Sequence, residues 1–195
     1  MTAGPRPAIL KGHPLIDPFC GRPMTESSFA DHQRNADDVG GLGFAVLTFS
    51  DSRSVESDAS GRAISDMVDA AGHRVARYAL LKDDAEAIRG KLTALLSEEQ
   101  VAVIVTSGGT GISARDSAYE VVSSLLEKRL DGFGELFRSL SYAEIGSPAM
   151  LSRAVGGIAG GKVVFALPGS TNAVRLGMEK LILPQAAHLY YELHK

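Results

Sequence analysis

The chain has 195 residues, of which 45% are hydrophobic and 22% are charged, so it is long enough to bury one hydrophobic core without disulfides or metals. Its net charge of -3, without any run of Lys or Arg, and its lack of Trp offer no basic surface or stacking platform for nucleic acid. Cys20 is the single cysteine, and no apolar stretch approaches the roughly 18 residues of a membrane span, so we expect a reducing, cytoplasmic compartment.

Residues 1–41 differ in composition from the rest of the chain, because five of the eight prolines fall within them. A Pro-rich, polar stretch of this kind predicts an N-terminal extension that is flexible or lies on the surface. We therefore expect one domain over residues 42–195. Met24 offers an alternative start, and the sequence leaves that alternative open.

The domain begins with a buried strand and a helix. Residues 44–49 form a short, nearly continuous apolar run, which is typical of a parallel strand covered on both faces. Apolar residues then recur at helical spacing over 64–71, and the pattern ends near Gly72. Asp58 or Ser60 would cap the start of that helix.

A second strand and helix and a third strand follow. Residues 73–81 alternate enough for an outer strand, and Asp83-Asp84 then begin a helix whose apolar residues share one face. Residues 101–107 are the most hydrophobic run of the chain and predict the central strand.

The rest of the chain continues the alternation. Two helical patterns, a short element, a strand and a final helix are predicted in turn at residues 121–126, 133–140, 148–154, 162–167 and 174–182. No repeat of fixed period accompanies them. The alternation of strands and helices predicts a single open α/β domain, a three-layer α/β/α sandwich with a mostly parallel sheet.

One stretch has the spacing of a nucleotide-binding motif without its chemistry. Residues 156–162 match a Walker A loop in the positions of glycine and lysine, but Val163 stands where Ser or Thr should bind magnesium. The stretch also leads into a strand, whereas a P-loop leads into a helix. We therefore predict no phosphate-binding loop there.

The central strand ends in a loop that is almost free of side chains, Gly108-Gly109-Thr110-Gly111, directly after Ser107. Glycine adopts positive φ and lets backbone N–H groups approach a ligand, which suits a phosphate or the edge of a pterin. Ligands bind at the carboxyl ends of the strands in open α/β sheets. We interpret this glycine loop (residues 108–111) as a ligand loop and not as a simple connection.

The pair Arg115-Asp116 follows the glycine loop. A guanidinium group binds phosphate through two parallel hydrogen bonds, and carboxylate oxygens are preferred ligands of Mg²⁺, so the pair suits a phosphate and a metal. The alternative is a solvated surface pair.

A second loop is predicted at the same edge of the sheet. The strand at 162–167 is closed by Pro168-Gly169-Ser170-Thr171, where Ser and Thr cap the final helix. The free N–H groups of that helix then point to the edge where the strands end. Two loops therefore converge on one edge.

Three aspartates are predicted at that edge. Asp51 and Asp83 follow the first and second strands, which in a parallel sheet places them at the same edge as Asp116. Phosphoryl chemistry needs anions that seat Mg²⁺ against a triphosphate, and three carboxylates would supply them. The alternative is that Asp83 or Asp84 caps a helix while Asp51 fixes a turn.

Four motifs occur in the order of a known family: the glycine loop with Arg115-Asp116, then Asp131-Gly-Phe-Gly-Glu135, Ser152-Arg153-Ala154 and Pro168-Gly169-Ser170. Together they resemble the molybdenum cofactor biosynthesis protein B family (MoaB/MogA type, a molybdopterin-binding domain). The resemblance extends from about Leu42 to the end and does not cover residues 1–41.

The resemblance implies a three-layer α/β fold, homotrimers or homohexamers, and binding of molybdopterin, a pterin that carries a phosphate and a dithiolene. Other molybdenum cofactor biosynthesis enzymes are implied as candidate partners. In the catalytic branch, the molybdopterin phosphate attacks the α-phosphate of ATP with the help of Mg²⁺, and pyrophosphate leaves. Asp83 and Asp116 match the important aspartates of that branch.

The predicted site therefore has three sets of residues. Asp83 and Asp116 are the candidate catalytic residues, and Asp51, Asp83 and Asp116 are the candidate Mg²⁺ ligands. The candidate residues for molybdopterin and ATP are Ser107, Gly108, Gly109, Thr110, Gly111, Arg115, Pro168, Gly169, Ser170 and Thr171.

The sequence departs from the catalytic branch at one element. That branch has Thr-Pro-Glu or Thr-Pro-Asp where this chain has Ala118-Tyr119-Glu120, so a hydroxyl is missing and bulk replaces a proline that would stiffen a helix start. Alanine at this position resembles the MoaB branch, some members of which bind the pterin without adenylylating it. An adenylyltransferase, a non-catalytic molybdopterin-binding or delivery protein, and a purely structural oligomer all stay open.

Overall fold

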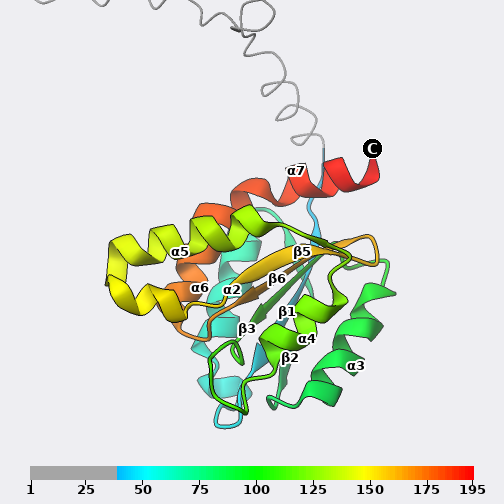
Figure 1. Cartoon of the computed structure of the whole chain (residues 1–195). Coiled ribbons are helices and arrows are strands. Elements are labelled where there is room, and N and C mark those ends of the chain that lie inside the picture. Colours follow the sequence, from blue (N-terminus) through cyan, green and yellow to red (C-terminus); the bar gives the residue numbers. More distant parts are fainter. Residues whose placement is uncertain (1–38) are drawn as a thin grey trace, which may run out of the picture.

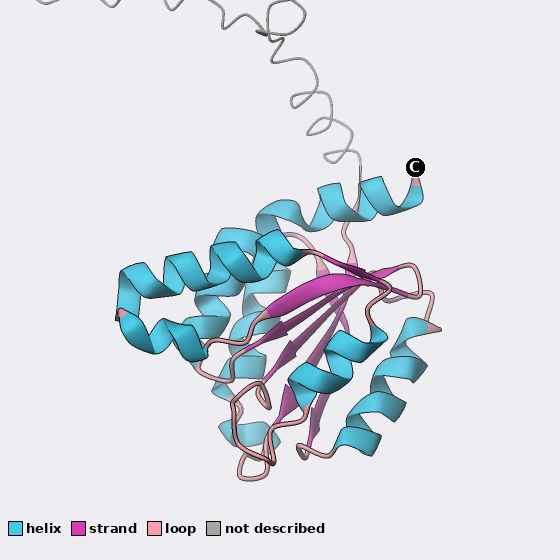
Figure 2. Cartoon of the chain, in the orientation of Figure 1, coloured by secondary structure: helices cyan, strands magenta, loops and turns pink. Residues whose placement is uncertain are grey.

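A computed structural model describes residues 39–195 of the chain. The predictions for the extension, including the alternative start at Met24, lie outside the described residues except at positions 39–41. Residues 39–195 form a six-stranded sheet with helices on both faces (Figure 1, Figure 2). This arrangement confirms the predicted three-layer α/β/α sandwich.

The strands lie in the order β2-β1-β3-β6-β5-β4 across the sheet. Their bounds are β1 (Gly43–Phe49), β2 (Arg74–Leu81), β3 (Val103–Ser107), β4 (Lys128–Arg129), β5 (Val155–Ala159) and β6 (Lys162–Leu167). The helices are η1 (Val55–Ser57), α2 (Ala59–Ala70), α3 (Ala85–Leu96), α4 (Ala118–Leu125), α5 (Asp131–Ile145), η2 (Ser147–Leu151), α6 (Thr171–Gly177), η3 (Met178–Ile182) and α7 (Leu183–His194).

The four strands β1, β2, β3 and β6 are parallel, so their carboxyl ends lie at one edge of the sheet, as predicted. β5 runs antiparallel to β6 and pairs antiparallel with the short β4. The residues that precede β5 therefore return to the edge where the parallel strands end. We call this edge the carboxyl edge.

A tight turn produces the antiparallel pair. Gly160 and Gly161 have φ of +52° and +69° and connect β5 to β6. Two residues with positive φ are typical of the turns that join hairpin strands. The Walker-like stretch is thus a strand and a hairpin turn that lead into β6, whereas a P-loop leads into a helix.

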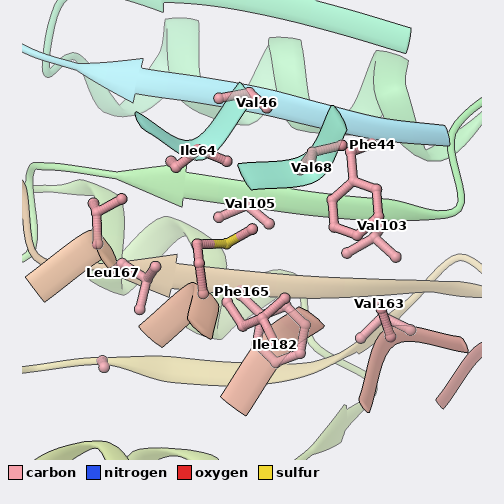
Figure 3. Packing of buried hydrophobic residues seen from close by; sticks show 14 of the residues in the cluster. Phe44, Val46, Ile64, Val68, Val103, Val105, Val163, Phe165, Leu167 and Ile182 are labelled. Carbon is pink, nitrogen blue, oxygen red and sulfur yellow. The ribbon is translucent and has the colours of Figure 1, made fainter. Parts of the chain in front are cut away.

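Alternate residues of β1 supply two hydrophobic cores. Phe44 and Val46 belong to the core on the side of α2, α5, α6 and α7, whereas Ala45 and Leu47 belong to the core beneath α3 and α4. Figure 3 shows the first core, where side chains of β1, β3 and β6 meet residues of α2 and Ile182 of η3. Burial on both faces explains the continuous apolar runs in these strands.

The final helix differs from the regular pattern that the sequence predicts. After α6, the segment η3 is a π-helix, in which the N–H of Leu183 donates to the carbonyl of Met178, five residues back. Pro184 follows in the first turn of α7. Because proline has no N–H and its ring crowds the preceding turn, a wider turn before it accommodates the ring.

No helix within residues 39–195 is both long enough and apolar enough to cross a membrane.

Candidate active site

Three loops meet at the carboxyl edge, after β1, β3 and β6. Gly108 has φ of +93°, and its N–H donates to the carbonyl of Leu167 at 3.1 Å. A Cβ on Gly108 would overlap the carbonyl of Phe49, and one on Gly169 would lie 3.1 Å from the Cα of Gly108. The three chain segments approach closely because these two positions have no side chain.

This junction lies where the sheet order reverses, between β1 and β3. The helix α2 follows β1 on one face of the sheet, and α3 precedes β3 on the other face (Figure 1). The crevice beyond such a reversal is the usual ligand site of open α/β sheets.

Arg53 links the loop after β1 to the loop after β6. Its guanidinium donates to the carbonyl of Gly169 at 2.9 Å and to the hydroxyl of Ser60 at 3.0 Å, and Ser60 Oγ donates to the same carbonyl at 2.8 Å. Arg53 Nη1 also lies 3.5 Å from Asp58 Oδ1. Sequence reasoning did not single out Arg53, because a turn residue gives no signal of a partner 116 positions away.

Asp58 is fully buried behind Arg53. Its side chain caps α2 by accepting from the N–H of Gly61 at 3.1 Å, and it accepts from Tyr78 Oη at 2.7 Å. Burial by itself would raise the pKa of Asp58, but hydrogen bonds from Thr48, Tyr78 and Gly61 hold that pKa below its ordinary value. Burial and, to a smaller extent, the hydrogen bond and charge of Asp58 raise the pKa of Tyr78 to about 12. This carboxylate is therefore a charged support beneath the site.

Asp83 lies directly against the glycine loop. Its Oδ1 accepts from the N–H of Ser117 at 3.1 Å and from the Ser117 hydroxyl at 2.8 Å, which anchors the start of α4. A Cβ on Gly109, whose φ is +63°, would overlap Asp83 Oδ2. Asp84, and not Asp83, caps α3, by accepting from the N–H of Ala87 at 2.8 Å. Asp83 thus anchors one helix while its second oxygen faces the glycine loop.

Asp51 and Asp116 lie at different points around the same loop. Asp51 is exposed, and its Oδ1 accepts from the N–H of Asp83 at 3.4 Å. Asp116 Oδ2 accepts from the N–H of Ser113 at 2.9 Å and lies where a Cβ on Gly111 would be. In the part of the chain that the structure describes, no three acidic, His or Cys side chains are grouped closely enough to hold a metal by themselves. Mg²⁺ is commonly held by one or two carboxylates together with substrate phosphates. Asp51, Asp83 and Asp116 are compatible only with this arrangement, in which the substrate supplies the remaining ligands.

Arg153 closes the far side of the glycine loop. Its Nε donates to the carbonyl of Thr110 at 2.9 Å, its Nη2 donates to the carbonyl of Gly111, and its Nη1 pairs with Glu120 Oε1 at 2.6 Å. The guanidinium carbon lies 4.5 Å from the centre of the Tyr119 ring. The hydrogen bond from Arg153 also lowers the pKa of Glu120. Because Arg153 donates hydrogen bonds to two carbonyls of the glycine loop, it fixes the conformation of that loop.

From the sequence alone, Arg153 is recognised only as part of a family motif, and no role can be assigned to it. Tyr119, which departs from the catalytic branch, and Glu120, which matches it, are the residues that hold Arg153. A usable signal was present: the Gly160-Gly161 turn implies a hairpin, and a hairpin returns the residues before β5 to the carboxyl edge.

The other candidate ligand residues are placed unevenly. Ser107 is buried, and its hydroxyl lies 3.4 Å from that of Thr48, inside the sheet and away from the loop surface. Thr110 is also buried, whereas Arg115 is exposed. Pro168 and Thr171 are half-buried in the third loop. Ser170 caps α6 by accepting from the N–H of Ala173 at 3.3 Å, as predicted.

The fold and the carboxyl edge together define a ligand-binding domain of the open α/β class, with a glycine loop held between aspartates and an arginine. Residues 45–188 match the family described as "Probable molybdopterin binding domain". The chain therefore belongs to this family, which confirms the resemblance drawn from its motifs.

Relatives and solved structures agree with the family. Molybdenum cofactor biosynthesis protein B of Bacillus cereus is 52% identical over 151 residues, which span 77% of this chain and 89% of that protein. A crystal structure of a molybdenum cofactor biosynthesis protein B is similar with a TM-score of 0.77 and 51% identity, covering 79% of this chain and 96% of that one. The tungsten cofactor synthesizing protein MoaB from Pyrococcus furiosus gives a TM-score of 0.72 and 34% identity, covering 80% and 98%.

Proposed function

We propose that this protein acts in molybdenum cofactor biosynthesis, where it binds molybdopterin and adenylylates it with Mg²⁺ and ATP. One observation carries the proposal: the glycine loop at the carboxyl edge lies between the carboxylates of Asp83 and Asp116. Relatives that share about half of the residues are named for this pathway, which supports the molybdopterin part of the proposal.

The proposed reaction transfers an adenylyl group. An oxygen of the molybdopterin phosphate forms a bond to the α-phosphorus of ATP, and the bond from that phosphorus to the oxygen bridging the α- and β-phosphates breaks, so that pyrophosphate leaves. A phosphate is already anionic at neutral pH, so it needs alignment and charge neutralisation more than a base.

The residues of the carboxyl edge suit these needs. Backbone N–H groups of the glycine loop would bind phosphate oxygens, and one or two of the carboxylates of Asp51, Asp83 and Asp116 would hold Mg²⁺ together with the triphosphate. When bound, Mg²⁺ neutralises charge on the triphosphate. Arg153 keeps the loop carbonyls turned toward itself.

Pyrophosphate release tests the adenylyltransferase directly. Purified protein is incubated anaerobically with molybdopterin, Mg²⁺ and ATP, and pyrophosphate is measured with a coupled assay. We expect release by the natural protein and at least about a 100-fold loss in Asp116→Asn, since electrostatic groups of this kind are worth that much in catalysis. Asp69→Asn, an exposed aspartate on α2, is the control and should keep full activity. Absence of pyrophosphate from the natural protein would rule out the reaction.

A non-catalytic molybdopterin-binding or delivery protein is the second candidate. It is favoured by Ala118, which is fully buried and has no hydroxyl, and by Tyr119, whose ring stacks on the guanidinium of Arg153 where the catalytic branch has proline. This function predicts tight molybdopterin binding by calorimetry without pyrophosphate release. Absence of molybdopterin binding would contradict both candidates.

Assembly and compartment belong to the same proposal. We propose a homotrimer or homohexamer in the cytoplasm, with other molybdenum cofactor biosynthesis enzymes as candidate partners. Sedimentation velocity of the purified full chain gives the number of copies, and a monomer would contradict the assembly.

A further inference from the structure

A small cavity lies at the carboxyl edge on the far side of Arg153. It has a volume of about 170 Å³ and is lined by Tyr119 of α4, by Gly134, Glu135 and Arg138 of α5, and by Ala154 just before β5. Pockets that hold a whole drug-sized ligand usually measure roughly 300–1000 Å³. This cavity therefore suits one ring system or one phosphate.

The cavity and the glycine loop share a wall. Val155 pairs with Ala166 near the carboxyl end of β6, which brings the start of β5 to the carboxyl edge. The ring of Tyr119 faces the guanidinium of Arg153 at 4.5 Å, and that guanidinium binds the carbonyl of Thr110. One ligand that extends past Arg153 would reach both places.

Two charged groups in the cavity have no partner within residues 39–195. Arg129 is engaged by Tyr119 and by Asp131, 3.3 Å away. In contrast, no hydrogen bond or ion pair involves the guanidinium of Arg138 or the carboxylate of Glu135 in the described chain. The cavity thus offers one charged donor and one charged acceptor.

Gly134 keeps the space between these groups open. A Cβ at this position would lie 3.0 Å from both the carbonyl of Ala154 and Nη1 of Arg138. That separation is tighter than ordinary van der Waals contact, so a side chain there would push the guanidinium or the carbonyl away by a few tenths of an ångström. The absence of a side chain at Gly134 therefore leaves room for the guanidinium of Arg138 beside the carbonyl of Ala154.

The pair of charges distinguishes between ligands. A phosphate would be attracted by Arg138 but repelled by Glu135. A flat heterocycle with a carbonyl beside an N–H and an amino group would satisfy both, because it accepts from the guanidinium and donates to the carboxylate. The Tyr119 ring supplies a flat wall for such a ligand.

We infer that this cavity binds the pterin ring of the ligand through Glu135 and Arg138, while the glycine loop holds the phosphate. The inference rests on the molybdopterin binding proposed above. It assigns recognition of the ring to the residues of α5 and binding of the phosphate to the glycine loop.

Calorimetry with two simple probes tests this division. The full chain and the variants Glu135→Gln and Arg138→Gln are titrated with 6-hydroxymethylpterin, which has the ring and no phosphate, and with inorganic phosphate. We expect each variant to bind the pterin at least about 10-fold more weakly, the usual effect of losing a charge-assisted hydrogen bond, and to bind phosphate like the natural protein. Glu144→Gln on the same helix and Arg175→Gln on α6, both exposed, are the matched controls and should change neither affinity.

The outcomes separate this inference from the proposed function. If the natural protein binds molybdopterin and both variants keep its affinity for 6-hydroxymethylpterin, the inference is overturned and the proposed function stands. Equal weakening of phosphate and pterin binding by Arg138→Gln also overturns it, because the cavity would then hold the phosphate. If the natural protein does not bind molybdopterin, the proposed function itself fails. Melting curves of each variant check that the fold is retained.

Discussion

The glycine loop is fixed by contacts with neighbouring residues, and Gly109 is one of its positions without room for a side chain. A side chain at this position would take up a strained φ and would overlap the carboxylate of Asp83 and the methyl group of Ala118. We expect Gly109→Ala to lower the free energy of unfolding by about 2–3 kcal/mol. In contrast, Gly90→Ala, on α3 with open space around it, should raise it by about 0.5–1 kcal/mol.

Chemical denaturation of both variants checks this pair. Equal stability of Gly109→Ala and the natural protein would show that the loop relaxes freely, which would contradict a loop fixed by Asp83 and Arg153.

Arg153 should matter through its shape as well as its charge. Lysine at this position keeps the charge but offers one nitrogen in place of the planar fork, whose three nitrogens reach two carbonyls and Glu120. We expect Arg153→Lys to weaken molybdopterin binding by about 10-fold and to speed hydrogen exchange of the loop amides, since one or two charge-assisted hydrogen bonds are lost. Arg175→Lys is the control. Unchanged exchange in Arg153→Lys would contradict the role given to Arg153.

Asp58 makes stability depend on acid pH. Its pKa in the folded protein is lowered below the ordinary value of 3.8, so the folded state binds this proton less readily than the unfolded chain does. The stabilisation is therefore complete above about pH 4–5 and is lost as pH falls through the folded pKa. Asp58→Asn should cost about 1–3 kcal/mol at pH 7 and should show a shallower loss of stability below pH 4. Urea unfolding from pH 3 to pH 7 measures both, and parallel curves would contradict the assignment.

At the scale of elements, Asp83 has two roles that substitutions can separate. It anchors the start of α4 through both the N–H and the hydroxyl of Ser117, and it is a candidate catalytic residue. Asparagine still accepts these hydrogen bonds, so Asp83→Asn should cost less than about 1 kcal/mol, whereas Asp83→Ala should cost about 1–2 kcal/mol. If the protein is an adenylyltransferase, both variants lose pyrophosphate release.

Melting and activity measured on the same samples decide between these roles. Full activity in a folded Asp83→Asn variant would show that Asp83 acts only as a helix anchor.

The sequence predicts strands well where both of their faces are buried. It predicts them poorly in the antiparallel part of the sheet. The runs at 44–49 and 101–107 are apolar throughout because helices cover both faces of β1 and β3. β5 contains Gly156 and Gly157, which carry no side-chain pattern, and the two residues of β4 are exposed. The loop aspartates could be placed from parallel topology alone, whereas placing Arg153 also requires the hairpin turn at Gly160-Gly161 to be recognised, since its place depends on the direction of β5.

At the scale of the whole molecule, the candidate site exists only because distant parts of the chain meet at one edge. Arg53 bonds to a carbonyl 116 positions away, and Arg153 reaches back 43 positions to Thr110. Such contacts make ligand binding and global stability depend on each other, because a ligand at the edge stabilises every segment that forms it.

This linkage gives a test that separates the two candidate functions. A ligand at 100 times its Kd adds about 2.7 kcal/mol, which for a domain of this size raises the Tm by roughly 5–10 °C. An adenylyltransferase should show such a rise with molybdopterin and also with ATP and Mg²⁺, whereas a binding or delivery protein should respond to molybdopterin alone. Chelation of Mg²⁺ with EDTA should abolish the response to ATP, because the carboxylates would then repel the uncompensated triphosphate. A rise with ATP that EDTA leaves unchanged would contradict the magnesium role of Asp51, Asp83 and Asp116.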